Sequence, residues 1–197
     1  MSDVTFRIIC EEHLALESVL RSLQKHLEDA RQLNARPDFL LVRSMLFYVD
    51  EFPEKQHHKK ESNLLFPKIR ARSLQARELM DQLDAEHAQG EHAIRRLEHA
   101  LLAYEVMGES RREAFEAAVN RYVDFYLAHM RLEESHVLPL ASRVLTAEDW
   151  AELDEAFARN QDPMVTQDPE QQYKTLYKRI AGQCSRLVGI NVIAGSP

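Results

Sequence analysis

The feature that most constrains the fold is a histidine on the apolar stripe of each of four long segments. Apolar residues recur at steps of three and four, the spacing of one face of an α-helix, in residues 2–33, 37–66, 73–107 and 110–140. The histidines on these four stripes are His13, His57, His87 and His129. Because buried polar groups need partners, four such histidines on four helices require a common explanation.

The spacing of these histidines predicts that they meet. Two residues on antiparallel neighbouring helices lie at the same height only if the connecting turn lies midway between them. The midpoints of the three successive histidine pairs are residues 35, 72 and 108, which fall in the polar turn 34–37, in the break before Ser73, and at Gly108. The sequence therefore predicts an all-α fold, an up-down-up-down four-helix bundle with the four imidazoles at one level.

The remainder of the chain predicts short C-terminal helices. Thr146 and Asp149 have the spacing of a helix start, and a last helix is expected to open at Asp168-Pro169 and stop at Gly182. We therefore expect a bundle over residues 1–145 and a helical extension with a tail over 146–197. Within the second long segment, Pro53 is expected to kink or break the helix.

Composition excludes several classes of protein. The net charge of −7 offers no broad basic face, so we expect no nucleic-acid partner. No run reaches the roughly 18 apolar residues of a membrane span, and the N-terminus lacks the apolar stretch of a secretion signal. Cys10 and Cys184 are not in a paired spacing. We expect a cytoplasmic protein without a membrane partner, and the sequence is compatible with a homo-oligomer.

Carboxylates accompany three of the four histidines at the helical spacing of four residues. Ionised carboxylates in a bundle core cost several kcal/mol each unless they are paired or bind metal. Mixed imidazole and carboxylate donors suit iron or manganese, and zinc less specifically, and seven donors suit two bridged ions. The predicted metal ligands are His13, His57, Glu61, His87, Glu91, His129 and Glu133.

Three neighbouring residues leave the ligand set open. His58 lies about 100° round the helix from His57, which favours the outer face or a supporting position. Glu134 competes with Glu133, which we favour because a spacing of four residues keeps the helix undistorted. His136 is left out of the set, and three roles stay open for it: a side chain that hydrogen-bonds a ligand, a ligand itself, or a polar residue at the end of the bundle.

Three stretches resemble the hemerythrin-like, or HHE cation-binding, proteins over about residues 5–145. They are His57-His-Lys-Lys-Glu-Ser-Asn-Leu-Leu-Phe-Pro67, Glu86-His87 with Gly90-Glu91, and His129-Met-Arg-Leu-Glu-Glu134 followed by Leu138-Pro139-Leu140. The resemblance implies that one iron is bound by His87, Glu91 and His129. It implies that the other iron is bound by His13 and His57, with Glu61 and Glu133 as bridges.

The resemblance also implies a function. A hemerythrin-like di-iron protein would bind a small diatomic ligand, O2 or nitric oxide, for sensing, storage or iron handling, and we expect a binding protein rather than an enzyme. The oxygen-storage hemerythrins carry a histidine where this chain has Glu91. A carboxylate there adds negative charge at the metals, which favours the ferric state and argues against reversible oxygen carriage.

Three alternatives remain open from the sequence. The first is a di-iron carboxylate enzyme of oxidase or peroxidase type, whose Glu-x-x-His motif occurs at Glu54–His57 and at Glu133–His136. The second is an iron-centre repair or nitrosative-stress protein, which would usually carry an additional cysteine-containing N-terminal region. The third is a metal-free bundle that serves only in protein interactions.

Overall fold

The computed structural model describes residues 3–159, 162–165 and 171–188, and the regular elements in these ranges are all helical. The predicted all-α fold is therefore confirmed for the described residues. None of their helices is long and apolar enough to cross a lipid bilayer.

Four rods form the body of the protein, and two of them are single regular helices. The first rod is α1 (Asp3–Gln32), and the third is α5 (Arg77–Met107), which follows a short 3₁₀ turn at Leu74–Ala76. The turns between rods lie where the sequence predicts them. Asp38 caps the second rod by accepting hydrogen bonds from the Leu40 and Leu41 amides, and Gly108 ends the third rod with a φ of 76°, which favours glycine.

The second and fourth rods contain π-helical turns within otherwise α-helical backbone. The second rod is α2 (Phe39–Val49), α3 (His58–Lys60) and α4 (Phe66–Arg72), joined by π-helical segments at Asp50–His57 and Glu61–Leu65. The fourth is α6 (Arg112–Leu132) and α7 (Leu138–Val144), joined by a π-helical segment at Glu133–Val137, after a 3₁₀ turn at Gly108–Arg111. Pro53 lies inside the first π-helical segment, so the α-helix is interrupted near this proline, as predicted, by a widened turn.

The two π-helical segments that begin at a glutamate share one sequence pattern, His-x-x-x-Glu-x-x-x-x-x-Pro. It runs from His57 through Glu61 to Pro67 and recurs 72 residues later from His129 through Glu133 to Pro139 (129 − 57 = 133 − 61 = 139 − 67 = 72). Proline lacks an amide hydrogen and its ring clashes with the carbonyl four residues earlier. The π-helical turn just before each proline closes with a hydrogen bond over five residues, from Phe66 to Glu61 and from Leu138 to Glu133. Each proline then lies in the first turn of the next α-helix, α4 or α7, where proline is tolerated.

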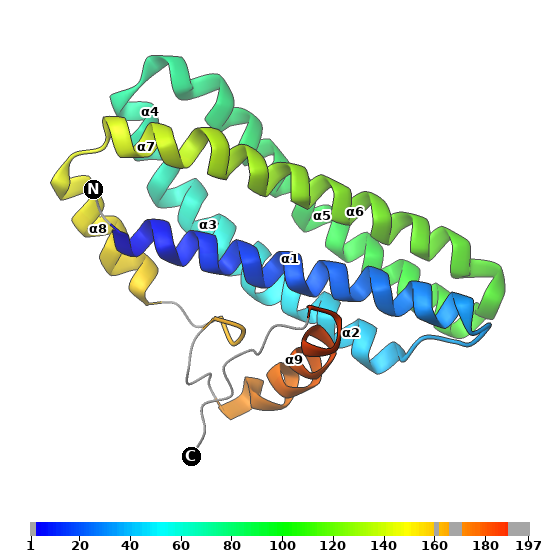
Figure 1. Ribbon diagram of the computed structural model, residues 1–197. Helices are drawn as coiled ribbons and strands as arrows, with labels where there is room; N and C mark the ends of the chain where they lie inside the picture. The colour runs from blue at the N-terminus through cyan, green and yellow to red at the C-terminus, as the bar shows by residue number, and fades with distance from the viewer. Residues whose placement is uncertain (1–2, 160–161, 166–170, 189–197) are drawn as a thin grey trace.

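Figure 1 shows the four rods lying side by side, with successive rods joined at alternate ends. The α5 rod packs on α6 and α2, and α1 packs on α6 and α2. The interior divides into two apolar clusters, one represented by Leu20, Met45 and Tyr126 and the other by Ile9 and Phe66. The buried polar residues of the site described below lie in the stretch of the rods between these clusters.

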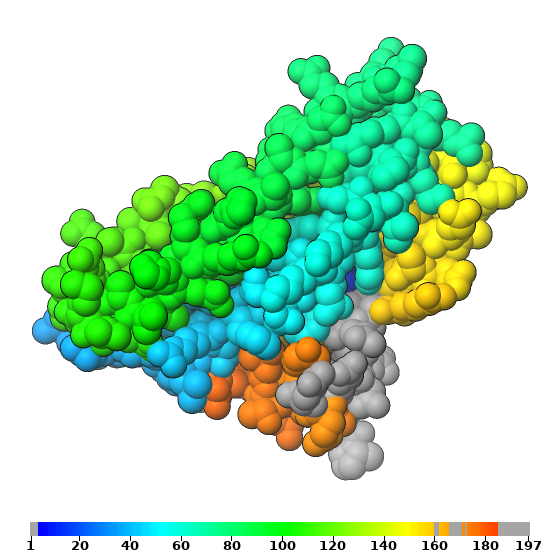
Figure 2. Space-filling model, turned by 180° about the vertical axis from the view of Figure 1, so that it is seen from behind, coloured from blue at the N-terminus to red at the C-terminus, as the bar shows by residue number. Residues whose placement is uncertain are grey.

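Two further helices cover the second and first rods. The helix α8 (Ala147–Ala158) begins with the predicted capping box of Thr146 and Asp149 and packs on α1. The helix α9 (Lys174–Val188), after a 3₁₀ turn at Gln171–Tyr173, packs on α1 and α2. Figure 2 shows α8 and α9 on separate stretches of the molecule.

The prediction for the last helix was wrong at its end. The helix α9 passes through Gly182 and continues to Val188, because one exposed glycine costs only about 1 kcal/mol in a helix. Asp168 and Pro169, where this helix was expected to open, lie outside the described residues.

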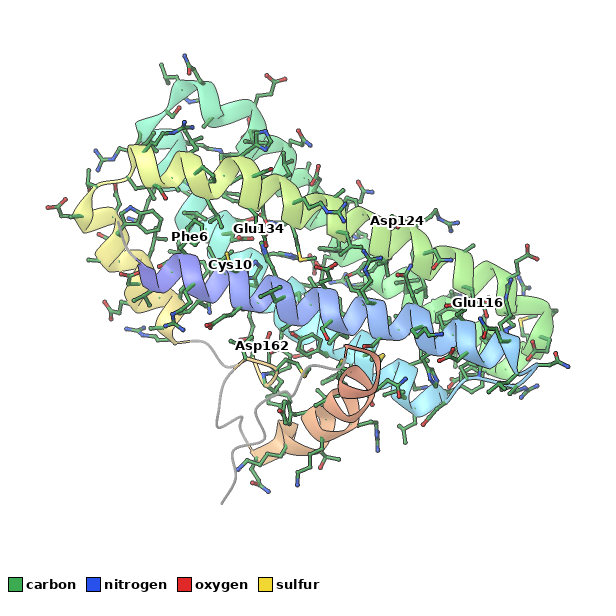
Figure 3. The ribbon with its side chains drawn as sticks, in the orientation of Figure 1. Phe6, Cys10, Glu116, Asp124, Glu134 and Asp162 are labelled. Carbon is green, nitrogen blue, oxygen red and sulfur yellow. The ribbon has the colours of Figure 1, made fainter. Side chains whose placement is uncertain are left out.

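Asp162 joins the C-terminal part of the chain to the second rod (Figure 3). The Tyr48 hydroxyl donates a 2.9 Å hydrogen bond to its Oδ2, and the Met164 amide donates a 2.8 Å bond to its Oδ1. Burial raises the pKa of this carboxyl from 3.8 to about 7, although both hydrogen bonds oppose the shift. The folded state therefore retains this proton at pH values where the unfolded chain loses it.

We predict that the free energy of unfolding of the Asp162→Asn variant depends less on pH than that of the wild type between pH 4 and pH 7.5. A raised folded-state pKa stabilises the fold below the unfolded value near 3.8, and this stabilisation is lost as pH rises to about 7. The free energy of unfolding of the wild type relative to the variant should fall by roughly 2–4 kcal/mol between pH 4 and pH 7.5. Urea unfolding of both proteins measures this difference, and parallel profiles would contradict the prediction.

Candidate metal centre

Two groups of buried side chains face each other between the apolar clusters. In each group the donor atoms lie within 4.8 Å of one another. The first group consists of His13, His57, Glu61 and Glu133, and the second consists of His58, His87 and His129. All seven side chains are buried, and all four rods contribute. The centre therefore exists only where the four rods come together.

The imidazole Nε2 atoms point inwards in pairs. His13 Nε2 lies 3.2 Å from His57 Nε2, and His87 Nε2 lies 3.1 Å from His129 Nε2. A metal ion about 2.1 Å from each of two imidazole nitrogens holds them about 3 Å apart when they bind at right angles. The spacing of both pairs therefore fits two ligands on one ion.

The opposite nitrogen of each imidazole, Nδ1, has an oxygen partner outside the centre. The pairs are His13 with Glu134 (2.9 Å), His57 with Glu12 (2.6 Å), His58 with Glu54 (3.2 Å), His87 with Ser62 (2.8 Å) and His129 with Glu86 (2.8 Å). In the four pairs with carboxylates the imidazole Nδ1–H is the donor, because an ionised carboxylate only accepts hydrogen bonds, and the Ser62 hydroxyl can accept from His87 in the same way. In a neutral imidazole this arrangement leaves a lone pair on Nε2, the form that metal-binding histidines adopt.

Glu61 and Glu133 lie between the imidazoles, and their side chains are only 1% exposed. No donor in hydrogen-bonding geometry reaches Glu61 Oε2 or either carboxylate oxygen of Glu133. Glu133 Oε2 lies 3.3 Å from His13 Nε2, whereas its Oε1 lies 3.4 Å from His129 Nε2. One carboxylate therefore faces both groups, as a carboxylate that bridges two cations would.

Glu61 also faces both groups, through a single oxygen. Its Oε2 lies 3.3 Å from His57 Nε2 and 3.6 Å from His87 Nε2. Buried carboxylate oxygens without hydrogen-bond donors are strongly unfavourable, and cations between the two groups would remove that cost. The residues present therefore fit two metal ions.

The negative charge of the carboxylates raises the pKa of imidazoles in both groups. Burial alone would lower the pKa of His129, but Glu133, with Glu86 and Glu61, raises it to about 10. Burial likewise opposes the raised pKa of His57, which results from Glu61 and Glu12. Burial, followed by the three neighbouring imidazoles, lowers the pKa of His58 well below its usual value. The centre attracts positive charge, which protons or metal ions can supply.

Six of the seven predicted ligands come together in this centre, and Glu91 does not. The Glu91 side chain is 46% exposed and forms an ion pair with Arg95 on the outer side of α5. The residue on the inner side of this turn is Gly90, which is buried. Glu91 follows His87 by four residues, but the face that it occupies points away from the neighbouring rods.

His58, expected on the outer face, lies inside the second group. Its ring stacks on His87 at 4.3 Å between centroids and lies 5.6 Å from His129. Each rod of a bundle touches two neighbours, so adjacent side chains about 100° apart can both point inwards. His57 turns to α1 and His58 to α5 and α6. The doubled histidine at 57–58 was the available sequence signal.

The structure also places the residues of the competing ligand sets. Glu134 is partly exposed and supports His13 from outside the centre. Figure 3 shows Glu134 between α1 and the fourth rod. His136 is exposed and pairs with the Ser135 hydroxyl. Glu54 lies behind His58. The Glu-x-x-His sets of the di-iron carboxylate enzymes therefore do not assemble around one point in the described residues.

Fold and site define a helical protein with a buried imidazole and carboxylate centre suited to metal cations. Residues 4–141 match the family model described as the hemerythrin HHE cation binding domain. The chain belongs to the hemerythrin HHE cation-binding family. Comparisons with curated proteins and with solved structures gave no match.

Paired substitutions distinguish the ligand set of the structure from that of the sequence. We predict that His58→Ala lowers the bound metal by about one ion per chain, because the second group loses one of its three imidazoles. Glu91→Ala should retain the wild-type metal content, because its carboxylate is half-exposed and pairs with Arg95. Elemental analysis after native purification measures both. Metal loss in Glu91→Ala with full retention in His58→Ala would contradict the assignment.

Proposed function

We propose that this protein is a hemerythrin-like di-iron protein that binds O2 or nitric oxide for sensing, storage or iron handling. In this proposal His13 and His57 would hold one iron, and His58, His87 and His129 would hold the other, with Glu61 and Glu133 shared between them. A bound iron pair would supply electrons to a diatomic ligand. Manganese or zinc are alternative occupants, but zinc would not supply electrons.

The observation that carries the proposal is the orientation of Glu133 between two sets of inward-pointing imidazoles. Its two oxygens lack hydrogen-bond donors and face different groups, His13 on one side and His129 on the other. A single tetrahedral ion would not use so many donors. Two cations explain both unpartnered oxygens at once.

The donor count supports a small-ligand site on the side of His13 and His57. If both carboxylates are shared, the His13–His57 side has two imidazoles and two carboxylates, and the other side has three imidazoles with the same two carboxylates, which lie 3.4 to 3.7 Å from the Nε2 atoms of His87 and His129. An ion with fewer protein donors retains more positions for an external ligand. We propose that O2 or nitric oxide binds on the His13–His57 side.

Replacing Glu91 by His58 in the proposed set changes the expected charge. The two carboxylates of the set, Glu61 and Glu133, leave a net charge of about +2 when two divalent ions bind. The argument for a preferred ferric state and against oxygen carriage required a third carboxylate at Glu91. That argument no longer applies to the proposed set, so oxygen binding is retained beside nitric oxide.

The overall organisation is part of the proposal. We propose that residues 1–145 form the up-down-up-down four-helix bundle that holds the irons, and that residues 146–197 form an extension. The di-iron enzyme and repair alternatives require turnover. Consumption of hydrogen peroxide or recovery of a damaged iron–sulfur enzyme by catalytic amounts of protein would favour them over ligand binding.

We predict that the natively purified protein contains about two metal ions per chain and that chelation lowers its melting temperature. An ion at a free concentration 100 times its Kd adds about 2.7 kcal/mol of stability. Adding azide to the ferric protein should produce a strong charge-transfer absorption. His57→Ala should weaken all three effects, whereas His92→Ala, which removes an exposed imidazole on α5, serves as the matched control.

Metal analysis would refute the proposal in one case. If neither native purification nor reconstitution with iron, manganese or zinc gave bound metal or a change in melting temperature, the centre would not be a metal site. A metal-free interaction bundle would then be the better description of the chain.

A further inference from the structure

A second buried polar cluster lies directly behind His58. Glu54, on the second rod, has a side chain that is only 1% exposed, and no Lys or Arg pairs with it in the described structure. The Tyr122 hydroxyl donates a 2.7 Å hydrogen bond to Glu54 Oε1, and the Tyr126 hydroxyl donates another to the same atom. Glu54 Oε2 lies 3.2 Å from His58 Nδ1. The two oxygens of this carboxylate therefore have different partners.

The backbone of α5 makes room for this cluster. A Cβ atom at Gly90 would lie 1.8 Å from the Tyr126 hydroxyl oxygen and 3.0 Å from Glu54 Oε1. Any side chain at this position would collide with the two groups that hydrogen-bond each other. The Tyr126 ring is also parallel to that of His58, with 5.5 Å between centroids and 6° between planes. Gly90, Tyr126, Glu54 and His58 thus form one packed unit.

Three features distinguish Glu54 from the oxygen partners of the other four imidazoles. Glu134 and Glu86 are partly exposed, and Ser62 is a neutral hydroxyl. Glu12 is buried, but in the part of the chain that the structure describes no pair of phenol hydroxyls donates to it. Glu54 alone among the five combines full burial with two donors on the oxygen that faces away from the imidazole. Such an arrangement aims the remaining oxygen at His58.

We infer that Glu54, held by Tyr122 and Tyr126 in the space left by Gly90, is a positioning residue that fixes the tautomer and orientation of His58 for metal binding. Because Oε1 accepts from both phenols, Oε2 is left to accept from the Nδ1–H of His58. The proton on Nδ1 keeps Nε2 free as a donor to the second ion. This inference rests on the proposed di-metal function.

The substitution Glu54→Gln tests this role with little change in shape. If the amide oxygen accepts from the two phenols, the amide NH2 faces His58 Nδ1, which must then accept, and the imidazole proton moves to Nε2. If the amide is reversed, its oxygen still accepts from the Nδ1–H of His58, but the NH2 then faces the two phenols, and both phenol hydrogens lose their acceptor. The first orientation keeps two phenol hydrogen bonds against one imidazole bond in the second, so we expect it to predominate and the metal-binding tautomer of His58 to be disfavoured.

The expected results are a loss of metal and a change in tautomer without a loss of fold. Glu54→Gln should bind about half the zinc or iron of the wild type, with the first group still occupied. The ¹⁵N NMR signals of His58 in the zinc-loaded protein should change from the Nδ1–H pattern. The metal-free variant should melt at or above the wild type, because a buried amide costs less than a buried carboxylate.

The matched control is Glu91→Gln, the same chemical change on an exposed carboxylate of α5, which should alter none of these measurements. Gly90→Ala is the second variant, and it displaces Tyr126 without changing any hydrogen-bonding group. It should shift the His58 signals and lower the metal content in the same direction. Gly90→Ala also provides the test if Glu54→Gln does not fold.

Two results would overturn the inference. One is wild-type metal content together with unchanged His58 signals in Glu54→Gln. The other is an equal loss of melting temperature in the metal-free and metal-loaded variant, which would indicate a structural role only. Failure of the wild type to bind metal would instead refute the proposed function, and the His58 tautomer in the metal-free protein would still test the positioning role.

Discussion

The burial of Glu61 and Glu133 is the constraint on which the rest of this structure depends. Both carboxylates are withdrawn from solvent, and three of their four oxygens have no hydrogen-bond donor. Such groups cost several kcal/mol each without compensating positive charge. The imidazoles around them are held in place by partners outside the centre, and the apolar clusters on either side exclude water. The four rods are therefore organised around negative charge that protons or metal ions must compensate.

Irregular helix geometry delivers the donors to this point. The π-helical segments begin at Glu61 and Glu133, and another ends at His57. Single π-helical turns are rare, and they frequently occur at functional sites. Here the prolines that follow each glutamate disfavour a regular α-helical turn. Local sequence and the requirements of the centre therefore favour the same departure from regular helix.

Much of the arrangement could be predicted from sequence, because helical periodicity and turn positions are local properties. The midpoints of the histidine pairs coincided with the turns predicted at 34–37, before Ser73 and at Gly108, and the structure has the rods end there. The distinction between His58 and Glu91 could not be made in the same way. It depends on which side of each helix meets a neighbouring rod, and a single-helix pattern does not contain that information. The prolines that follow Glu61 and Glu133 were also visible in the sequence, but helical periodicity alone does not distinguish a π-helical turn from a regular one.

Each of the two groups of buried donors combines side chains from distant parts of the chain. The group of His13, His57 and Glu61 comes from the first two rods but is completed by Glu133 from the fourth. The group of His87 and His129 comes from the last two rods but includes His58 from the second. Neither pair of rods contains a complete group, so a nascent or partly unfolded chain offers only fragments of each site. Cations would then bind only late in folding, after both pairs of rods have packed together, and would stabilise that packing.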